Sequence, residues 1–123
     1  MLNESSSSVR VFYPRLGRDE VIREIKRGLD DLGRGLPLLL VVLFGSYARG
    51  DYTVASDVDL LVVYGGRRRK DAFALVKGAF DIPNLQPHVY SEYEYRRLKD
   101  AIGPMTRGGV VFLSRARGLQ VSL

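Results

Sequence analysis

The sequence predicts an α/β domain in which helices flank one mixed sheet. Short apolar runs of strand length alternate with segments whose apolar residues recur every three or four positions, as in amphipathic helices. The 123 residues contain neither an internal repeat nor a long linker, and this length is typical of one domain. We therefore expect a flexible, serine-rich tail over residues 1–10 and a single domain over residues 11–123.

A helix and two strands are predicted in the first half of the domain. Residues 18–32 carry apolar side chains at steps of three and four, and Gly33 and Gly35 are expected to stop this helix, a stop that Pro37 supports. Residues 38–44 are apolar on both faces, which indicates a strand that is buried on both sides. Residues 47–54 predict a helical turn and a loop, and the valine- and leucine-rich residues 58–64 predict the second strand.

The second half of the domain predicts further helices and strands. Residues 70–80 form a helical pattern, and residues 85–90 and 110–113 have the length and composition of strands. Pro87 cannot donate a hydrogen bond to a neighbouring strand, so the strand that contains it is expected at an edge of the sheet.

A helix start is predicted directly after that edge strand. Ser91 is a suitable N-cap, and Glu94 follows at the spacing of a capping box. The glycine–proline pair at positions 103–104 is expected to end the helix.

Composition excludes several classes of protein. The chain has no cysteine, which excludes disulfides, zinc thiolate sites and thiol nucleophiles, and its one histidine excludes a multi-histidine metal site. No apolar run approaches the roughly 18 residues of a membrane span, and no secretory signal is evident. We expect a cytoplasmic protein without a membrane partner. The net charge of +5 favours polyanionic ligands, with nucleotides preferred over nucleic acid.

Two carboxylates mark the start of the second predicted strand. Asp57 and Asp59 are two residues apart, so their side chains project from the same face. Like charges repel, and burial of either is costly unless something compensates it. Mg²⁺ supplies that compensation because it prefers carboxylate oxygens and substrate phosphates, and paired ions stabilise the attacking and leaving oxygens in nucleotidyl transfer. The two aspartates are therefore the predicted catalytic residues and metal ligands.

A Gly-Ser pair follows the first predicted strand. Gly45 lets the backbone approach a ligand closely, and Ser46 offers its hydroxyl and free backbone N–H groups to an anion if it opens a short helix. Arg49 lies in the adjoining loop and is a candidate for contact with the nucleotide or its acceptor. A lone Gly-Ser pair is commonly a turn, and a lone Asp-x-Asp is a weak signal. Their combination predicts a metal–nucleotide cleft that Ser46 shares with Asp57 and Asp59.

These residues resemble the signature of the minimal nucleotidyltransferases in the DNA polymerase beta superfamily. The resemblance covers roughly residues 18–113. Its further elements are Ala48-Arg49-Gly50, Ser56, the passage from Val89 to Tyr95, and Gly109-Val110-Val111. It implies a nucleotidyltransferase fold like the polymerase beta palm and Mg²⁺ held by the aspartates. It also implies a nucleoside triphosphate at Gly45 and Ser46, which donates its monophosphate (AMP from ATP) to an acceptor hydroxyl.

The resemblance also implies a protein partner, and this chain differs from the family pattern at one position. Minimal nucleotidyltransferases are often paired with HEPN proteins in toxin–antitoxin modules, where the transferase is the antitoxin and the acceptor is a tyrosine of the toxin. The family has a third acidic residue where this chain has Gln86. A glutamine can ligate a metal through its oxygen but brings no negative charge. The alternative is a catalytically weak or inactive homologue that binds nucleotide or a partner, and a nucleic-acid-binding module ranks last.

Three other features receive structural interpretations. Residues 67–70 form a basic run, which is interpreted as a solvated surface in preference to a contact with nucleic acid or an acidic partner. Helix stability does not explain this run, because cations at a helix N-terminus oppose the helix dipole. His88 lies on the strand face of Gln86 and is interpreted as a hydrogen-bonding residue, not a catalyst. Tyr90, Tyr93 and Tyr95 are interpreted as core or interface residues, not as a base-stacking platform.

Overall fold

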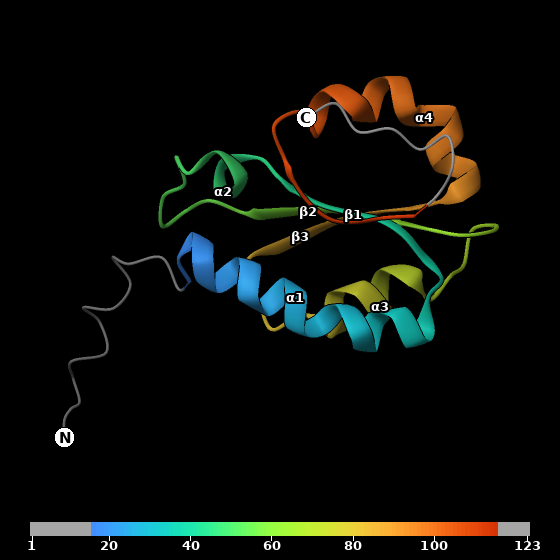
Figure 1. Cartoon of the computed structure of the whole chain (residues 1–123), viewed down its shortest axis with the longest axis horizontal. Coiled ribbons are helices and arrows are strands. Elements are labelled where there is room, and N and C mark those ends of the chain that lie inside the picture. Colours follow the sequence, from blue (N-terminus) through green and yellow to red (C-terminus); the bar gives the residue numbers. More distant parts are fainter. Residues whose placement is uncertain (1–15, 116–123) are drawn as a thin grey trace.

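A four-stranded sheet lies between two layers of helices. The structure, a computed structural model, describes residues 16–115, and the tail predicted over residues 1–10 lies outside this range. The elements are α1 (Arg18–Gly35), β1 (Leu38–Phe44), α2 (Ser46–Arg49), β2 (Val58–Tyr64), α3 (Ala72–Ala79), β3 (Leu85–Ser91), α4 (Glu92–Met105) and β4 (Val110–Ser114). Helices α1 and α3 cover one face of the sheet, and α4 covers the other (Figure 1).

The sheet is mixed, as predicted. Its strand order is β3-β2-β1-β4; β1 is antiparallel to both of its neighbours, whereas β2 and β3 are parallel. Strand β3 is at an edge, which confirms the position predicted from Pro87. Apolar side chains alternate between two core clusters. Leu60 and Val62 face α1 and α3, and Leu61 and Val63 face α4. Odd-numbered positions of β2 therefore lie on the α4 face.

Helix α1 is longer than predicted. Neither Gly33 nor Gly35 stops it, because the backbone N–H of Leu36 still donates to the carbonyl of Leu32 at 2.9 Å. Leu36 itself has extended backbone angles, which the following Pro37 favours because an αR conformation before proline is sterically disfavoured. The proline, not the glycines, determines where the helix ends.

Helix α4 begins as predicted and ends later. The Ser91 hydroxyl accepts a hydrogen bond from the backbone N–H of Glu94, and the Glu94 carboxylate accepts one from the backbone N–H of Ser91. Pro104 lies inside the last turn of the helix instead of beyond it. The hydroxyl of Thr106 donates to the carbonyl of Gly103 at 3.1 Å, so the end of the helix keeps a local hydrogen-bond partner.

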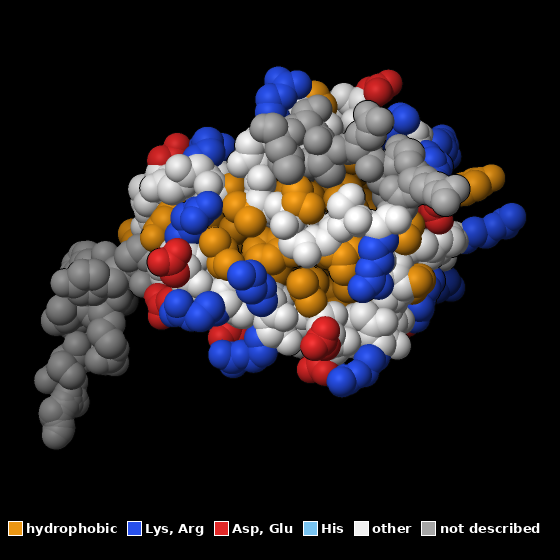
Figure 2. Space-filling model, viewed as in Figure 1, with side chains coloured by type: hydrophobic (Ala, Val, Ile, Leu, Met, Phe, Trp, Pro, Cys, Tyr) orange, Lys and Arg blue, Asp and Glu red, His pale blue; other side chains and the backbone are white. Residues whose placement is uncertain are grey.

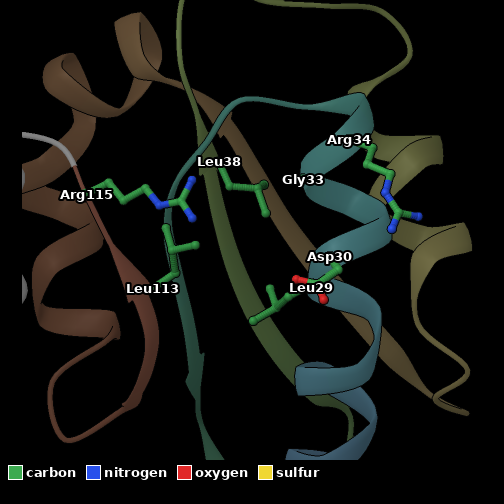
Figure 3. Close-up of a pocket in the computed structure, with 7 residues that line it drawn as sticks. All are labelled: Leu29, Asp30, Gly33, Arg34, Leu38, Leu113 and Arg115. Carbon is green, nitrogen blue, oxygen red and sulfur yellow. The ribbon is translucent and has the colours of Figure 1, made fainter.

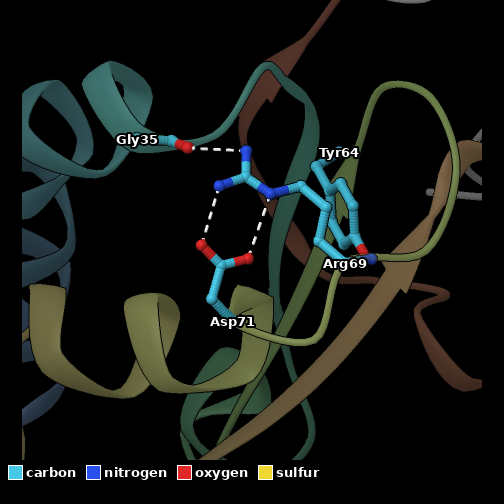
Figure 4. Close-up of polar contacts among 4 residues, drawn as sticks. All are labelled: Gly35, Tyr64, Arg69 and Asp71. Carbon is cyan, nitrogen blue, oxygen red and sulfur yellow. Dashed lines mark hydrogen bonds and ion pairs between the residues drawn. The ribbon is translucent and has the colours of Figure 1, made fainter.

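The basic run after β2 is exposed, but Arg69 is not simply solvated. Its guanidinium donates two hydrogen bonds to Asp71, at 3.0 and 2.8 Å, and a third to the carbonyl of Gly35 at 2.9 Å (Figure 4). The backbone N–H of Arg69 donates to the Tyr64 hydroxyl at 2.7 Å. Residues 67–70 are thus exposed, as predicted, and Arg69 in addition joins the end of α1 to the start of α3.

Charge is spread over the surface seen in Figure 2. Lysine and arginine side chains surround this face on all sides and are interspersed with aspartate and glutamate, while hydrophobic side chains gather in its middle (Figure 2). None of the helices within residues 16–115 combines the length and hydrophobicity that crossing a bilayer requires.

Candidate functional site

Asp59 lies between its two neighbouring strands at the start of β2. It pairs with Phe44, the last residue of β1, and with Gln86 on β3. Its odd number places the side chain on the α4 face of the sheet. The Asp59 side chain is 27% exposed, so a bound ligand can reach it.

Gly45 makes room for this carboxylate. A Cβ atom at position 45 would lie 2.5 Å from Oδ2 of Asp59, a distance that real Cβ contacts essentially never show. The backbone of Gly45 also has φ +77°, a region that favours glycine. Only glycine satisfies both conditions, so this residue lets the backbone and the Asp59 carboxylate lie close together.

His88 contacts the other oxygen of the same carboxylate. Nε2 of His88 lies 3.2 Å from Oδ1 of Asp59. The imidazole also meets the ring of Phe44 edge to face, with 4.9 Å between ring centroids, and its side chain is 25% exposed. The aspartate is therefore flanked by Gly45 on one side and by His88 on the other.

Gln86 lies beside Asp59, at the position where the resemblance to minimal nucleotidyltransferases implies a third acid. Since β2 and β3 are parallel and Asp59 pairs with Gln86, both side chains lie on the same face of the sheet. The Gln86 side chain is exposed. The alignment that places an uncharged amide beside Asp59 agrees with the observed register.

Asp57 directly precedes β2 and is exposed. The segment around it is held by two backbone hydrogen bonds: Ser56 donates to Thr53 at 3.1 Å, and Val58 donates to the carbonyl of Asn84 at 2.9 Å. These bonds fix the chain on both sides of the carboxylate.

The remaining predicted site residues lie on α2, beside Gly45. Ser46 is the first residue of this four-residue helix, and Arg49 is the last. The Arg49 guanidinium forms an ion pair with Asp51 at 3.2 Å, and both side chains are 62% exposed. Arg49 thus lies close to Gly45 in the sequence, but in this structure its guanidinium is paired with Asp51.

A hydrogen-bonded cluster joins the loop after α2 to the start of α1. The rings of Tyr47 and Tyr52 stack with centroids 4.1 Å apart. The backbone N–H of Arg18 donates to the Tyr52 hydroxyl at 3.0 Å, and its guanidinium donates to the carbonyls of Tyr47 and Ala48. Burial, and secondarily the neighbouring Tyr52, raise the pKa of Tyr47. This cluster fixes the loop that connects Gly45 to Asp57.

The sequence did not identify the contact partners that hold the site in place. His88 was assigned a structural role without a partner, and its position two residues from Gln86 was the only signal that it faces Asp59. Nothing in the order of residues indicated that Arg18 reaches the loop after α2, because 34 positions separate Arg18 from Tyr52.

A separate cavity lies between α1 and β4. It has a volume of about 460 Å³, and Figure 3 shows side chains from α1 and from the end of β4 around it. Its lining residues are Leu29, Asp30, Gly33, Arg34, Leu38, Leu113 and Arg115. None of the predicted site residues is among them, so this cavity is distinct from the region around Asp59.

The donor set around Asp59 fits a metal that arrives with its nucleotide. Within residues 16–115, no three His, Cys, Asp or Glu side chains are grouped closely enough to hold an ion by themselves. Mg²⁺ does not require such a group, because it is usually bound through one or two carboxylates together with substrate phosphates. Asp57 and Asp59 are the two carboxylates that the sequence predicts for this role, and Gly45 leaves room for Asp59 close to the backbone.

The motif and the fold are shared with known proteins. The nucleotidyltransferase domain family matches residues 22–106 of the chain. Two curated proteins of Methanocaldococcus jannaschii, both provisionally named protein adenylyltransferases, are 44% identical over 48 residues and 48% identical over 44 residues. The alignments cover 39% and 36% of this chain and 47% and 43% of the relatives. The chain therefore spans about half the length of the curated relatives it matches.

A solved structure extends the similarity to the whole chain. The crystal structure of a provisionally assigned nucleotidyltransferase from Sulfolobus solfataricus superimposes with a TM-score of 0.57 over 98% of each chain. The two sequences are 24% identical, so this likeness concerns the fold alone. The nucleotidyltransferase fold predicted from the sequence is confirmed.

Proposed function

The chain belongs to the nucleotidyltransferase domain family, and from this premise we propose that it transfers AMP from ATP to an acceptor hydroxyl, with release of pyrophosphate. The observation that carries the proposal is the arrangement around Asp59. Its carboxylate packs so closely against Gly45 that a Cβ atom at position 45 would lie 2.5 Å from Oδ2. The Asp59 side chain nevertheless remains partly exposed. A glycine with positive φ that faces an acidic side chain suits the binding of a phosphate-bound cation.

Each predicted residue has a role in this proposal. Asp57 and Asp59 hold Mg²⁺, which when bound stabilises charge on the attacking and leaving oxygens. Gly45 admits the phosphates close to the backbone, and Ser46 offers its hydroxyl to them. The Arg49 guanidinium leaves its ion pair with Asp51 and contacts a phosphate or the acceptor instead. Exposed ion pairs contribute little, with a median of about 0–1 kcal/mol, so this exchange has a low cost.

We propose a protein as the acceptor. The provisional names of the two Methanocaldococcus relatives, protein adenylyltransferases, support both the nucleotide and the acceptor. The resemblance to minimal nucleotidyltransferases narrows the proposal to a tyrosine of a small helical HEPN protein, with this chain as the antitoxin. The acceptor hydroxyl attacks the α-phosphate, the bond to the β-phosphate breaks, and the hydroxyl proton leaves to solvent or a base.

Labelled nucleotide transfer tests this function directly. The purified chain is incubated with Mg²⁺, α-labelled ATP and the product of the adjacent gene, and intact mass is measured for both proteins. We expect the partner to gain one AMP, and the gain to depend on Mg²⁺ and on Asp59. Absence of both Mg²⁺-dependent ATP binding and transfer would contradict the proposal.

Gln86 favours a second candidate role. Gln86 lies beside Asp59 in the strand register, where the resemblance implies a third carboxylate, so the site has one negative charge fewer. In that case the chain binds ATP and a partner but transfers AMP slowly or not at all. The same experiment separates the two roles, because binding without a mass gain supports the second.

A further inference from the structure

We propose that His88 is a positioning residue for Asp59, which orients the carboxylate so that one oxygen is left for the metal of a bound metal–nucleotide complex. This inference rests on the proposed function. It assigns a role to the one histidine of the chain, whose imidazole lies at the candidate site.

The hydrogen bond to an ionised carboxylate requires a proton on Nε2 of His88. An ionised carboxylate only accepts hydrogen bonds, so Nε2 of His88, 3.2 Å from Oδ1 of Asp59, must be the donor. The ring is held by its edge-to-face contact with Phe44, whose backbone pairs with Asp59. The strand that precedes Gly45 thus also fixes the imidazole.

The two carboxylate oxygens of Asp59 have different neighbours. Oδ1 is engaged by His88, whereas Oδ2 faces Gly45, where a Cβ would come within 2.5 Å. A carboxylate restrained in this way cannot rotate freely about its terminal bond. Oδ2 is thereby directed to the side where the Gly-Ser motif would hold phosphates, and it keeps lone pairs for a cation.

The neighbouring Gln86 explains why such a restraint matters in this chain. A third carboxylate at position 86 would share the metal with Asp59, but the amide there carries no charge. Asp59 therefore contributes a larger share of the metal's ligation, and its orientation has more influence on affinity. Hydrogen-bond partners of metal ligands generally change metal affinity by about 10- to 100-fold when they are removed.

Two substitutions of similar size separate positioning from packing. His88→Gln retains an N–H donor at about the place of Nε2, whereas His88→Leu fills the space without a donor. We expect His88→Leu to bind the Mg²⁺ complex of a non-hydrolysable ATP analogue about 10- to 100-fold more weakly than the wild type, and His88→Gln to recover most of that loss. Calorimetry gives the affinities, and thermal unfolding verifies that both variants fold.

The measurement is repeated with the analogue in the presence of a chelator and without Mg²⁺. A positioning role predicts that the wild type and the two variants then bind equally. Equal Mg²⁺-dependent affinity of wild type and His88→Leu, or equal weakening in both variants, overturns the role of His88 while the proposed function stands. Absence of Mg²⁺-dependent binding in the wild type overturns the proposed function and this inference together.

Discussion

The two ends of strand β2 carry opposite charge and use it differently. Asp57 and Asp59 lie at its start, and four consecutive cations, residues 67–70, follow its end. At about 3.3 Å per residue, the five steps from Asp59 to Tyr64 separate the two ends by roughly 17 Å. Within residues 16–115, the side chain of Asp59 has a single hydrogen-bond partner, His88, and remains partly exposed. Arg69, in contrast, donates three side-chain hydrogen bonds, two to Asp71 and one to Gly35.

The comparison shows that a dense run of charges in the sequence does not by itself mark a ligand-binding site. The acidic pair is incompletely neutralised by the protein, which is the condition for binding a cation. The basic run of residues 67–70 contains more charges in sequence, but Arg69 within it binds Asp71 and Gly35 and so links α1 to α3. We expect substitutions at the start of β2 to change ligand binding and substitutions after its end to change stability.

The largest effect is expected from the paired aspartates. In Asp57→Asn/Asp59→Asn, the amides cannot replace the negative charge that attracts Mg²⁺, so Mg²⁺-dependent ATP binding should become undetectable by calorimetry. Asp30→Asn/Asp100→Asn makes the same change in net charge at exposed positions outside the site and should bind as the wild type. Unchanged affinity in the folded site variant would falsify the metal role of both residues.

The next effect is a gain of function at Gln86. Gln86→Asp adds a carboxylate beside Asp59 on the same face of the sheet. Proton transfer by a positioned group is typically worth about 10²–10⁴-fold in rate, so AMP transfer to any bound acceptor should rise markedly. Single-turnover transfer of labelled AMP measures the change. Gln86→Asn is the matched control, because it has the size of aspartate without the charge.

Efficient transfer by the wild type, together with no change in Gln86→Asp, would mean that another group does the work of the third carboxylate. The second candidate role would then be wrong, whereas the metal role of Asp57 and Asp59 would be unaffected.

A smaller effect is expected at Gly45. Gly45→Ala introduces a Cβ 2.5 Å from Oδ2 of Asp59 and also strains a backbone with φ +77°. Gly50→Ala imposes a similar strain at φ +89° with nothing within 4 Å of the new atom. Gly50→Ala should lose on the order of 1–2 kcal/mol of unfolding free energy and Gly45→Ala more, because its Cβ also clashes with Asp59; only Gly45→Ala should weaken Mg²⁺–ATP binding. Equal affinities of the two variants would contradict the close approach of Asp59 to the backbone.

Much of the fold follows from patterns that are local in the sequence. The strands, the Ser91 cap and the edge position of β3 were predicted because alternation, capping spacing and a proline act within a few residues. Asp57 was placed on the face of Asp59, and His88 on the face of Gln86, because the period of a strand is two. These features need no knowledge of what lies on the other side of the molecule.

The features that the sequence did not predict depend on contacts between distant segments. The sequence placed the cations of residues 67–70 next to the start of α3, where they oppose the helix dipole. It did not show that Arg69 reaches the carbonyl of Gly35 at the end of α1, where a cation is favourable. His88 and Asp59 are likewise 29 positions apart, so their hydrogen bond appears only in the folded chain.

The smallest effect is expected from the basic run. Arg69→Met should lower the melting temperature, because it removes both hydrogen bonds to Asp71 and the one to Gly35 while keeping most of the side-chain volume. Arg68→Met is the matched control, since Arg68 forms no ion pair with any other residue of the part described, 16–115. Neither variant should change Mg²⁺–ATP affinity. A loss of affinity in Arg69→Met would mean that the two ends of β2 are coupled.

The acid dependence of this difference follows from Asp71. The hydrogen bonds from Arg69 lower the pKa of the Asp71 carboxyl in the folded chain. A carboxyl whose folded pKa is lowered stabilises the fold above its unfolded pKa of about 4, and this contribution is lost as the pH falls through the folded value. The gap in melting temperature between wild type and Arg69→Met should thus be constant near neutral pH and narrow below about pH 4. Thermal unfolding followed from pH 7 to about pH 3 measures it. A gap that stays constant over this range would assign the effect of Arg69 to its bond with Gly35 alone.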